Sequence, residues 1–214
     1  HIFGGVNTGG GFFSYYNDIF KDIKRVFILK GGPGTGKSTL IKKVAKYYSD
    51  LGYHLIYVHC SGDVDSLDGV IVSDLSIAVV DATSPHPIEP TLVGLKDEII
   101  NLTMYLDRNI LLENETEIIK YNNDKSLFYK ETYKKLKEAS YLNNNLKEIF
   151  KMIDDSEIID KKKNEILNKI FDETSTPKQG KVFRAFCNAI TPSGIISFEE
   201  HFRKYLLDDK VNAT

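Results

Sequence analysis

Features that mark several classes of protein are absent from this sequence of 214 residues. It contains two cysteines, Cys60 and Cys187, which form neither a Cys-x-x-Cys pair nor a metal-binding spacing. We therefore expect reduced thiols and no disulfide framework or zinc site. No apolar run approaches the roughly 18 residues that cross a membrane, and no basic segment leads into an apolar one at the start. These absences predict a cytoplasmic protein without a membrane span or a signal peptide.

Arginine is scarce, and lysine supplies most of the positive charge. The formal net charge is −2, which gives no support for general binding to nucleic acids or membrane surfaces. Hydrophobic residues make up 42% of the chain, enough for a sizeable core. The length suits one α/β domain with an elaboration, or two small domains. The four arginines are Arg25, Arg108, Arg184 and Arg203.

A glycine-rich segment over residues 31–39 is the strongest motif present. It reads Gly-Gly-Pro-Gly-Thr-Gly-Lys-Ser-Thr and fits the phosphate-binding P-loop pattern G-x-x-x-x-G-K-[ST]. The apolar run 25–30 before it predicts a buried strand, and the spacing of apolar residues in 40–48 predicts a helix. Glycines let phosphates approach backbone N–H groups at the positive end of that helix. The expected nucleotide-binding residues are Gly32, Pro33, Gly34, Thr35, Gly36, Lys37, Ser38 and Thr39.

A second motif supplies the metal side of this site. We expect Lys37 to reach the β- and γ-phosphates and the Ser38 hydroxyl to bind Mg²⁺. Residues 76–81 form a small apolar run that ends in Asp81, the Walker B pattern of a buried strand. A carboxylate in that position holds Mg²⁺ opposite the P-loop hydroxyl. The sequence therefore predicts Ser38 and Asp81 as metal ligands, with Mg²⁺ and ATP as cofactor and ligand.

An acidic loop is the candidate for the remaining chemistry. Residues 54–60 predict a strand that runs into the loop 61–69, and open α/β sheets bind ligands beyond the carboxyl ends of their strands. Asp63, Asp65 or Asp68 would then orient a water, a metal-bound water or an acceptor hydroxyl; an ordinary polar turn is the alternative. Ala82 follows Asp81, so the adjacent glutamate of many ATPases is absent. We therefore assign Lys37, Asp63 and Asp65 as catalytic candidates.

The composition changes between residues 95 and 171, where glycine and proline are absent. Leu142, Leu146, Ile149 and Ile153 have the spacing of a helical stripe, and residues 154–156 offer N-cap groups for a further helix. We expect an antiparallel helical hairpin attached to the core, with its lysines in solvent. The predicted organisation is a P-loop core over residues 1–93, a helical elaboration over 94–175 and a further unit over 180–214.

That further unit resembles the start of the chain. Residues 191–198, Thr-Pro-Ser-Gly-Ile-Ile-Ser-Phe, match residues 8–15, Thr-Gly-Gly-Gly-Phe-Phe-Ser-Tyr, at an offset of 183, the difference between 191 and 8. We call residues 1–20 the first repeat and residues 180–214 the second repeat. At this offset Gly31 would correspond to Thr214, so the similarity indicates a truncated tandem array of P-loop modules.

This internal similarity carries three structural expectations. Both repeats should have the same local shape, a strand, a glycine turn and a helix start. The first repeat should pack beside the P-loop strand, which it immediately precedes. The second repeat should dock on the core of the same chain and bring Arg184 or Arg203 near the nucleotide. A sharper interpretation places residues 8–11 over the nucleotide itself.

These segments together resemble an uncharacterised bacterial family of tandem P-loop proteins, described as ATP-binding, ATPase or nucleotide-kinase-like. The resemblance implies a P-loop NTPase fold, with a mostly parallel central sheet flanked by helices, and ATP binding. It implies no particular substrate. The chain departs from the family pattern because it lacks the second P-loop. The resemblance rests on residues 1–20, 25–39, 59–69 and 77–86 and on the second repeat.

Three functions follow from this sequence. The first is an ATPase, and the second is transfer of phosphate to a small acceptor such as a nucleoside or nucleotide. Enzymes of the second kind usually stabilise the transferring charge with several arginines, and four in the chain are few. The third is an interaction module in which ATP binding orders the helices for a partner with negligible turnover. ATP is the default nucleotide because neither N-K-x-D nor L-S-G-G-Q occurs. The expected partners are ATP or ADP, a small phosphate acceptor, and a second module or second copy.

Overall fold

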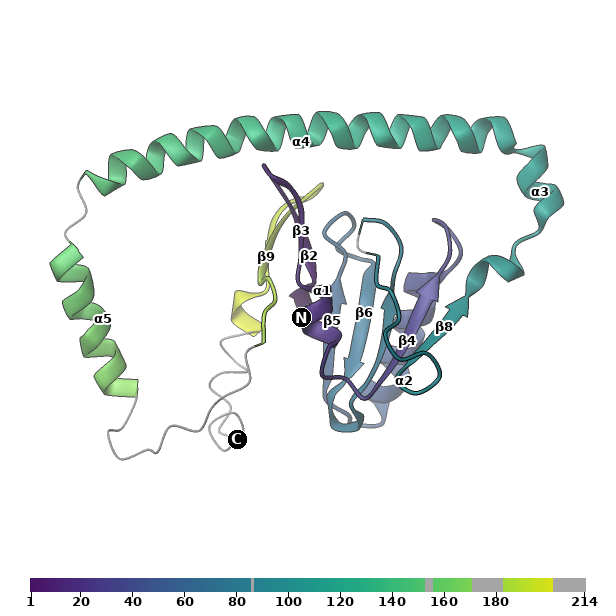
Figure 1. Ribbon diagram of the computed structural model, residues 1–214, viewed down its shortest axis with the longest axis horizontal. Coiled ribbons are helices and arrows are strands. Elements are labelled where there is room, and N and C mark those ends of the chain that lie inside the picture. Colours follow the sequence, from purple (N-terminus) through teal and green to yellow (C-terminus); the bar gives the residue numbers. More distant parts are fainter. Residues whose placement is uncertain (86, 153–155, 171–182, 202–214) are drawn as a thin grey trace.

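The core is a mixed six-stranded sheet with helices on both faces (Figure 1). The computed structural model describes residues 1–85, 87–152, 156–170 and 183–201. Strand β6 is antiparallel to β5 and β7, and the other neighbouring pairs are parallel, which confirms the predicted α/β class. In spatial order the strands are β1 (Ile2–Phe3), β5 (Leu55–His59), β6 (Leu67–Val72), β7 (Ile77–Asp81), β4 (Arg25–Lys30) and β8 (Asp97–Asn101).

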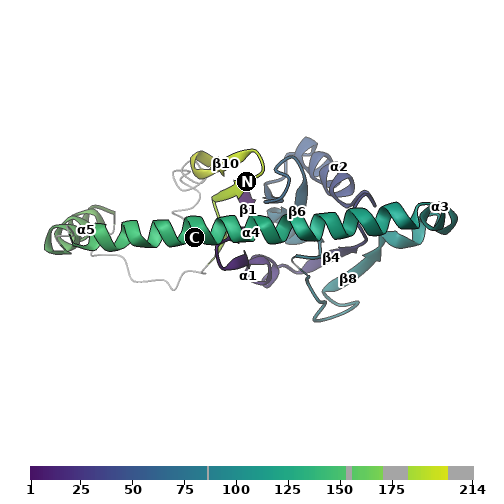
Figure 2. The same cartoon turned by 90° about the horizontal axis from the view of Figure 1, so that it is seen from above.

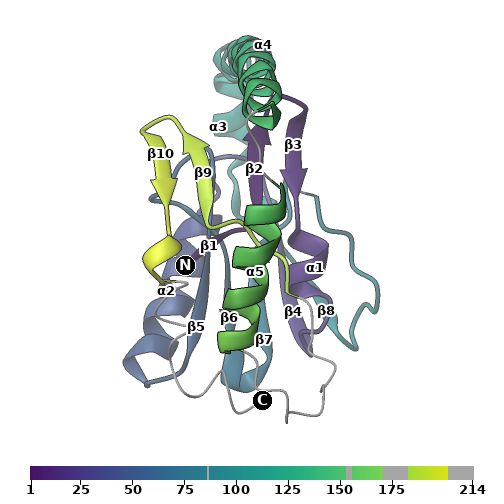
Figure 3. The same ribbon diagram turned by 90° about the vertical axis from the view of Figure 1, so that its left-hand side faces the viewer.

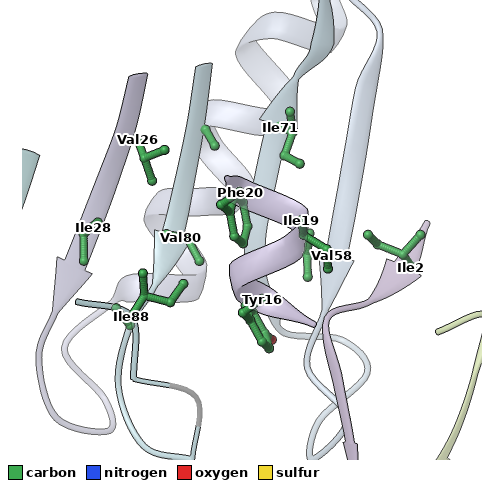
Figure 4. Packing of buried hydrophobic residues seen from close by; sticks show 12 residues of the cluster. Ile2, Tyr16, Ile19, Phe20, Val26, Ile28, Val58, Ile71, Val80 and Ile88 are labelled. Atoms are coloured by element: carbon green, nitrogen blue, oxygen red, sulfur yellow. The ribbon is translucent and has the colours of Figure 1, made fainter. Parts of the chain in front are cut away.

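Two helices cover opposite faces of this sheet (Figure 3). Helix α1 (Tyr16–Phe20) buries Tyr16, Ile19 and Phe20 against one face, where they meet Val58 and Val80 (Figure 4). Helix α2 (Lys37–Asp50) packs Ile41 and Ala45 on the other face. Because both faces are covered, the central strands are apolar on both sides rather than alternating. The P-loop lies between β4 and α2 and is held by this packed core.

Strand β8 extends the core beyond the boundary at residue 93 that the sequence predicts. It pairs in parallel with β4 from Asp97 to Asn101 and forms one edge of the sheet. The strand has the short sequence Asp-Glu-Ile-Ile-Asn, and most of its residues are exposed, as an edge strand allows. Because it contains few apolar residues, its composition resembles that of the helical region that follows.

The helical region is not the antiparallel hairpin that the stripe predicts. Helix α4 (Glu115–Lys151) is one continuous helix that passes over the end of the sheet, and α5 (Ser156–Ile170) turns away from it (Figures 1 and 2). Leu142, Leu146 and Ile149 therefore stay exposed, by 67%, 49% and 55%. No glycine or proline interrupts α4. Within the described ranges no helix is long and apolar enough to cross a membrane.

Three short helices complete the described part of the chain. Helix α3 (Arg108–Glu113) leads into α4, and Asp107 caps it by accepting a hydrogen bond from the Asn109 N–H at 2.9 Å. The 3₁₀ helix η2 (Leu102–Tyr105) joins β8 to α3, and η1 (Ser73–Leu75) joins β6 to β7. Because these connections are short, each one keeps the two elements that it joins close together.

Each repeat folds into a small antiparallel hairpin. The first consists of β2 (Gly5–Thr8) and β3 (Gly11–Ser14), and the second of β9 (Asn188–Thr191) and β10 (Gly194–Ser197). The expectation of a common local shape is confirmed, and each repeat also has a second strand.

The expectation that the first repeat packs beside the P-loop strand is wrong. Strand β1 pairs with β5 at the far edge of the sheet, because α1 crosses the sheet face before the chain enters β4. The second repeat docks on this chain's own first repeat, as expected. Arg184 lies 3.8 Å from Asp18 of α1, so the contact made by its guanidinium is with α1 rather than with the P-loop; Arg203 lies outside the described residues.

Candidate nucleotide-binding site

The P-loop backbone follows the conformation that its glycines permit. Gly34 and Gly36 have φ of 80° and 86°, in the left-handed region that other residues rarely adopt. A Cβ built on either would meet nothing within 4 Å, so the loop presents open backbone on that side. Gly36 is the N-cap of α2 and provides no side-chain cap, which leaves the first N–H groups of the helix available to an anion.

Lys37 is buried at the centre of this loop, with 8% of the residue exposed. Its Nζ donates hydrogen bonds to the carbonyl oxygens of Gly31 at 2.7 Å and Gly32 at 2.8 Å. The same Nζ lies 3.6 Å from Oδ2 of Asp81. Strand pairing explains this contact, because Leu29 of β4 is the register partner of Asp81 of β7. The two sequence motifs therefore meet at the carboxyl ends of adjacent parallel strands.

Asp81 and Ser38 are each held by a neighbouring loop. Oδ1 of Asp81 accepts hydrogen bonds from the backbone N–H of Thr83 at 2.9 Å and from its hydroxyl at 2.6 Å. Oγ of Ser38 accepts a hydrogen bond from the N–H of Leu67 at 3.0 Å. Thr83 thus fixes the Asp81 carboxylate in this structure. The link from Ser38 to Leu67 has no signal in the sequence, because it joins residues far apart in the chain.

The other P-loop residues form its accessible rim. Thr35 is half-buried and donates from its hydroxyl to the Gly32 carbonyl at 2.8 Å. Gly31 is packed more tightly, since a Cβ there would lie 2.6 Å from the Thr35 hydroxyl oxygen. The exposed members are Gly32, Pro33, Gly34, Gly36 and Thr39.

The acidic loop has its own internal hydrogen bonds. Asp63 and Asp65 are both exposed. Asp63 accepts hydrogen bonds from the Ser66 hydroxyl at 2.6 Å and from the Asp65 N–H at 3.3 Å. These bonds tighten the turn that delivers Leu67 to Ser38. Among the described contacts neither carboxylate touches the P-loop.

Comparison with known families agrees with this geometry. The model of the ATPase family associated with various cellular activities (AAA) matches residues 27–196. The chain belongs to the AAA family. No curated protein and no solved structure matches the chain. The AAA match begins inside β4 and ends inside β10, so it spans the P-loop, Asp81 and the long helices. The chain is thus a nucleotide-binding P-loop protein of the ATPase type.

A buried polar cluster lies next to the AAA nucleotide site. Asp68, 6% exposed, accepts a hydrogen bond from the Tyr16 hydroxyl at 2.7 Å. Burial, and then the negative charge of Asp68, raise the pKa of Tyr16 well above its usual range. The same two causes raise the pKa of Cys60 to about 12, so this thiol stays protonated at neutral pH. The sequence offers Asp68 as a candidate but gives no sign of its partner Tyr16.

The donor atoms of the AAA site suit magnesium. A serine hydroxyl and a carboxylate are hard oxygen ligands, and Mg²⁺ commonly takes only one or two protein ligands beside phosphate oxygens and water. In the described part of the chain no group of three or more His, Cys, Asp or Glu residues could hold a metal by itself. The residues present therefore fit a magnesium ion that arrives with a nucleotide, held by Ser38 and Asp81.

Proposed function

We propose that this chain binds ATP with Mg²⁺ at the P-loop and hydrolyses it. The observation that carries the proposal is the 3.6 Å approach of Lys37 Nζ to Asp81 Oδ2. Lys37 begins α2, which the P-loop joins to β4, and Asp81 ends β7, the strand paired with β4. A phosphate-binding cation and a metal-side carboxylate therefore meet beside an uncapped helix N-terminus. That combination suits a magnesium-bound triphosphate better than a simple anion.

The residues would divide the chemistry as follows. Lys37 would transfer its hydrogen bonds from the carbonyls of Gly31 and Gly32 to β- and γ-phosphate oxygens. Ser38 and Asp81 would hold Mg²⁺, which when bound would supply positive charge to those oxygens. Asp63 or Asp65 would orient the attacking water and accept its proton, while the bond from the γ-phosphorus to ADP breaks. Loop movement would be needed, because both residues lie in an exposed turn and the Asp63 carboxylate is hydrogen-bonded within it.

The phosphotransferase alternative receives less support from the charged groups. Arg25 pairs with Glu98 at the start of β4, away from the P-loop end, and Arg184 pairs with Asp18. The described contacts of these two arginines thus lie outside the site where transferring charge would develop. ADP formation that depends on an added nucleoside or nucleotide would favour this alternative over hydrolysis.

An interaction module is the second candidate, and one contact favours it. A Cβ on Gly62 would lie 3.4 Å from the Tyr129 hydroxyl, so α4 passes close to the loop that reaches Ser38 through Leu67. Large apolar side chains along α4, including Phe128 at 69% exposed, are available to a partner. Tight ATP binding with negligible phosphate release would favour this function.

Calorimetry and phosphate release test the central proposal. We expect the chain to bind ATP more tightly with Mg²⁺ than without it and to release phosphate without an acceptor. Lys37→Ala should abolish measurable binding of Mg·ATP while the far-ultraviolet circular dichroism stays unchanged. Lys42→Ala, an exposed lysine on the same helix, is the matched control. Equal affinity in the wild type and Lys37→Ala would refute the site.

Asp81→Asn separates the metal from the nucleotide. Because Asp81 would act through the ion, this variant should weaken Mg²⁺-dependent binding or turnover more than metal-free binding. Asp22→Asn, an exposed carboxylate before β4, serves as its control. If Asp81→Asn lowers both kinds of binding equally, or neither, the Walker B assignment is wrong.

A tandem arrangement is also part of the proposal. The second repeat has the same hairpin that precedes the first P-loop core, and such a duplication suits a chain of two P-loop modules. The same argument supports the resemblance to tandem bacterial proteins.

A further inference from the structure

The two repeats match one another down to single hydrogen bonds. In the first, the Thr8 hydroxyl donates to the Gly11 carbonyl at 2.7 Å and accepts from the Gly10 N–H at 3.2 Å. In the second, Thr191 makes the corresponding bonds to Gly194 at 2.8 Å and from Ser193 at 3.2 Å. The turn glycines have matching φ of 107° and 101°. The 183-residue offset therefore relates two copies of one structural unit.

The contact between the two copies is reciprocal. The N–H of Phe3 donates to the Phe186 carbonyl at 2.8 Å, and the N–H of Phe186 donates to the Phe3 carbonyl at 3.0 Å. Phe3 and Phe186 occupy the same position in their repeats, since they differ by the same offset. A residue that pairs with its own counterpart lies on a local twofold axis.

Two aromatic stacking contacts obey the same symmetry. Tyr15 stacks on Phe186 with ring centroids 4.8 Å apart, and Phe198 stacks on Phe3 at 4.9 Å. Tyr15 and Phe198 are again counterparts at the 183-residue offset. Each repeat thus places the same two ring positions in its stacking contacts with the other repeat. An isologous interface, in which both partners use one and the same surface, has this property.

The axis lies at the edge of the main sheet. Strand β1 pairs with β5 on one side, and on its other side Phe3 pairs with Phe186. Phe3 is fully buried, and Val6 and Ala189, a further counterpart pair, are 7% and 4% exposed. An uncovered edge strand offers unpaired N–H and C=O groups to another chain, and the second repeat covers those groups at Phe3 of the β1 edge.

We propose that the shared surface of the repeats is a homotypic docking site, whose fitting partner is another repeat of the same kind. Two P-loop cores that meet through it are related by the twofold axis and join their sheets through antiparallel β1 edges. In this chain the second repeat fills the surface. When it is displaced, the occupant is the first repeat of a second copy of this chain. The pairing needs no nucleotide, so its test is independent of the test for ATP hydrolysis.

Releasing the second repeat tests the proposal in the full chain. Phe186→Asp places a charge against Tyr15 and Phe3, which should dislodge the second repeat and leave the first one free. We expect the wild type to sediment as a monomer and Phe186→Asp to show a doubling of mass in equilibrium with monomer. Adding Tyr15→Asp to Phe186→Asp should return the protein to a monomer, because the first repeat then loses its own ring. Ile195→Asp is the matched control, since Ile195 lies in the second repeat but is 78% exposed.

Each outcome decides the question. A cooperative thermal transition, monitored by circular dichroism, confirms that each variant is folded. If Phe186→Asp is not folded, Phe186→Ser is tested in its place. A folded, monomeric Phe186 variant would overturn the proposal, because the first repeat would then not be self-complementary. A dimer that persists in Tyr15→Asp/Phe186→Asp would overturn it too, since association would use another surface.

Discussion

At the scale of single residues, Lys37 shows how the fold keeps a binding group in place. Removing an ammonium group from water is costly unless it is paired and hydrogen-bonded. The carbonyls of Gly31 and Gly32 and the carboxylate of Asp81 meet that need. Charged phosphate oxygens offer stronger hydrogen bonds to the same ammonium group than neutral carbonyl oxygens do. The Lys37 ammonium group thus has hydrogen-bond partners within the protein and can exchange them for the oxygens of a ligand.

Asp97 provides a prediction about stability and pH. Its Oδ2 accepts hydrogen bonds from the Thr91 N–H at 2.7 Å, the Thr91 hydroxyl at 3.0 Å and the Leu92 N–H at 2.9 Å. Burial raises the pKa of Asp97, but these bonds outweigh it and leave the pKa below the usual value. A lowered pKa means that the ionised carboxylate stabilises the fold above the unfolded pKa of about 3.9. That contribution is lost as the pH falls through the folded pKa.

We therefore expect Asp97→Asn to lower the free energy of unfolding by about 1–3 kcal/mol at pH 7. The difference from the wild type should shrink as the pH falls below the unfolded pKa, because the wild type then also loses its charge. Urea denaturation at neutral and acidic pH measures both quantities. Asp22→Asn, which is exposed, should show neither effect. A pH-independent loss would point to altered packing instead of the charge.

At the scale of elements, α4 is a long helix with one anchoring region. Tyr133 donates to the Asn7 side chain at 2.8 Å, and Gly9 of the first repeat lies against Leu136 and Ser140. These are among the few half-buried positions of a helix that has no buried residue. The anchor thus joins the helix to the hairpin of the first repeat.

Gly9→Ala should weaken this anchor. A Cβ at Gly9 would lie 2.5 Å from the Ser140 Cβ and 2.9 Å from the Leu136 carbonyl oxygen, so the hairpin and the helix must separate. We expect faster hydrogen exchange over residues 129–140, with the P-loop core unchanged. Gly10→Ala is the matched control, because its nearest neighbour would be the Thr8 hydroxyl at 3.7 Å. Equal exchange in both variants would show that the hairpin does not hold α4.

Elements with strong local patterns are the ones that the sequence predicts well. The P-loop strand, its helix and the strand ending at Asp81 carry both apolar runs and motif residues, and all three are confirmed. Strand β8 was missed because an edge strand with one exposed face has little apolar content. The helical hairpin was wrong because an apolar stripe indicates a helix without indicating its partner. Pairing of β1 with β5 depends on the path of α1, which no local pattern records.

At the scale of the whole molecule, three distant segments converge on the nucleotide side. The loop 61–66 delivers Leu67 to Ser38, places Val64 in the apolar cluster of the two repeats, and lies beside Tyr129 of α4 at Gly62. A change at Ser38 therefore has a continuous packed route to the repeats and to the long helix. Packed routes of this kind carry coupling only if a common element changes its state. The loop 61–66 is the element to examine.

Hydrogen exchange with and without Mg·ATP measures whether that loop responds. A ligand that binds only the folded protein suppresses opening of the segments that hold it, by about 2.7 kcal/mol at a hundredfold excess over Kd. We expect added protection over residues 31–40 and 61–67, and none in α5, which lies away from the sheet (Figure 1). Lys37→Ala should abolish the change throughout, and Lys42→Ala should keep it. Added protection over residues 129–140 would favour the interaction module, because nucleotide binding would then order α4. Protection confined to the P-loop would mean that Leu67 does not transmit binding, and coupling through the loop would be refuted.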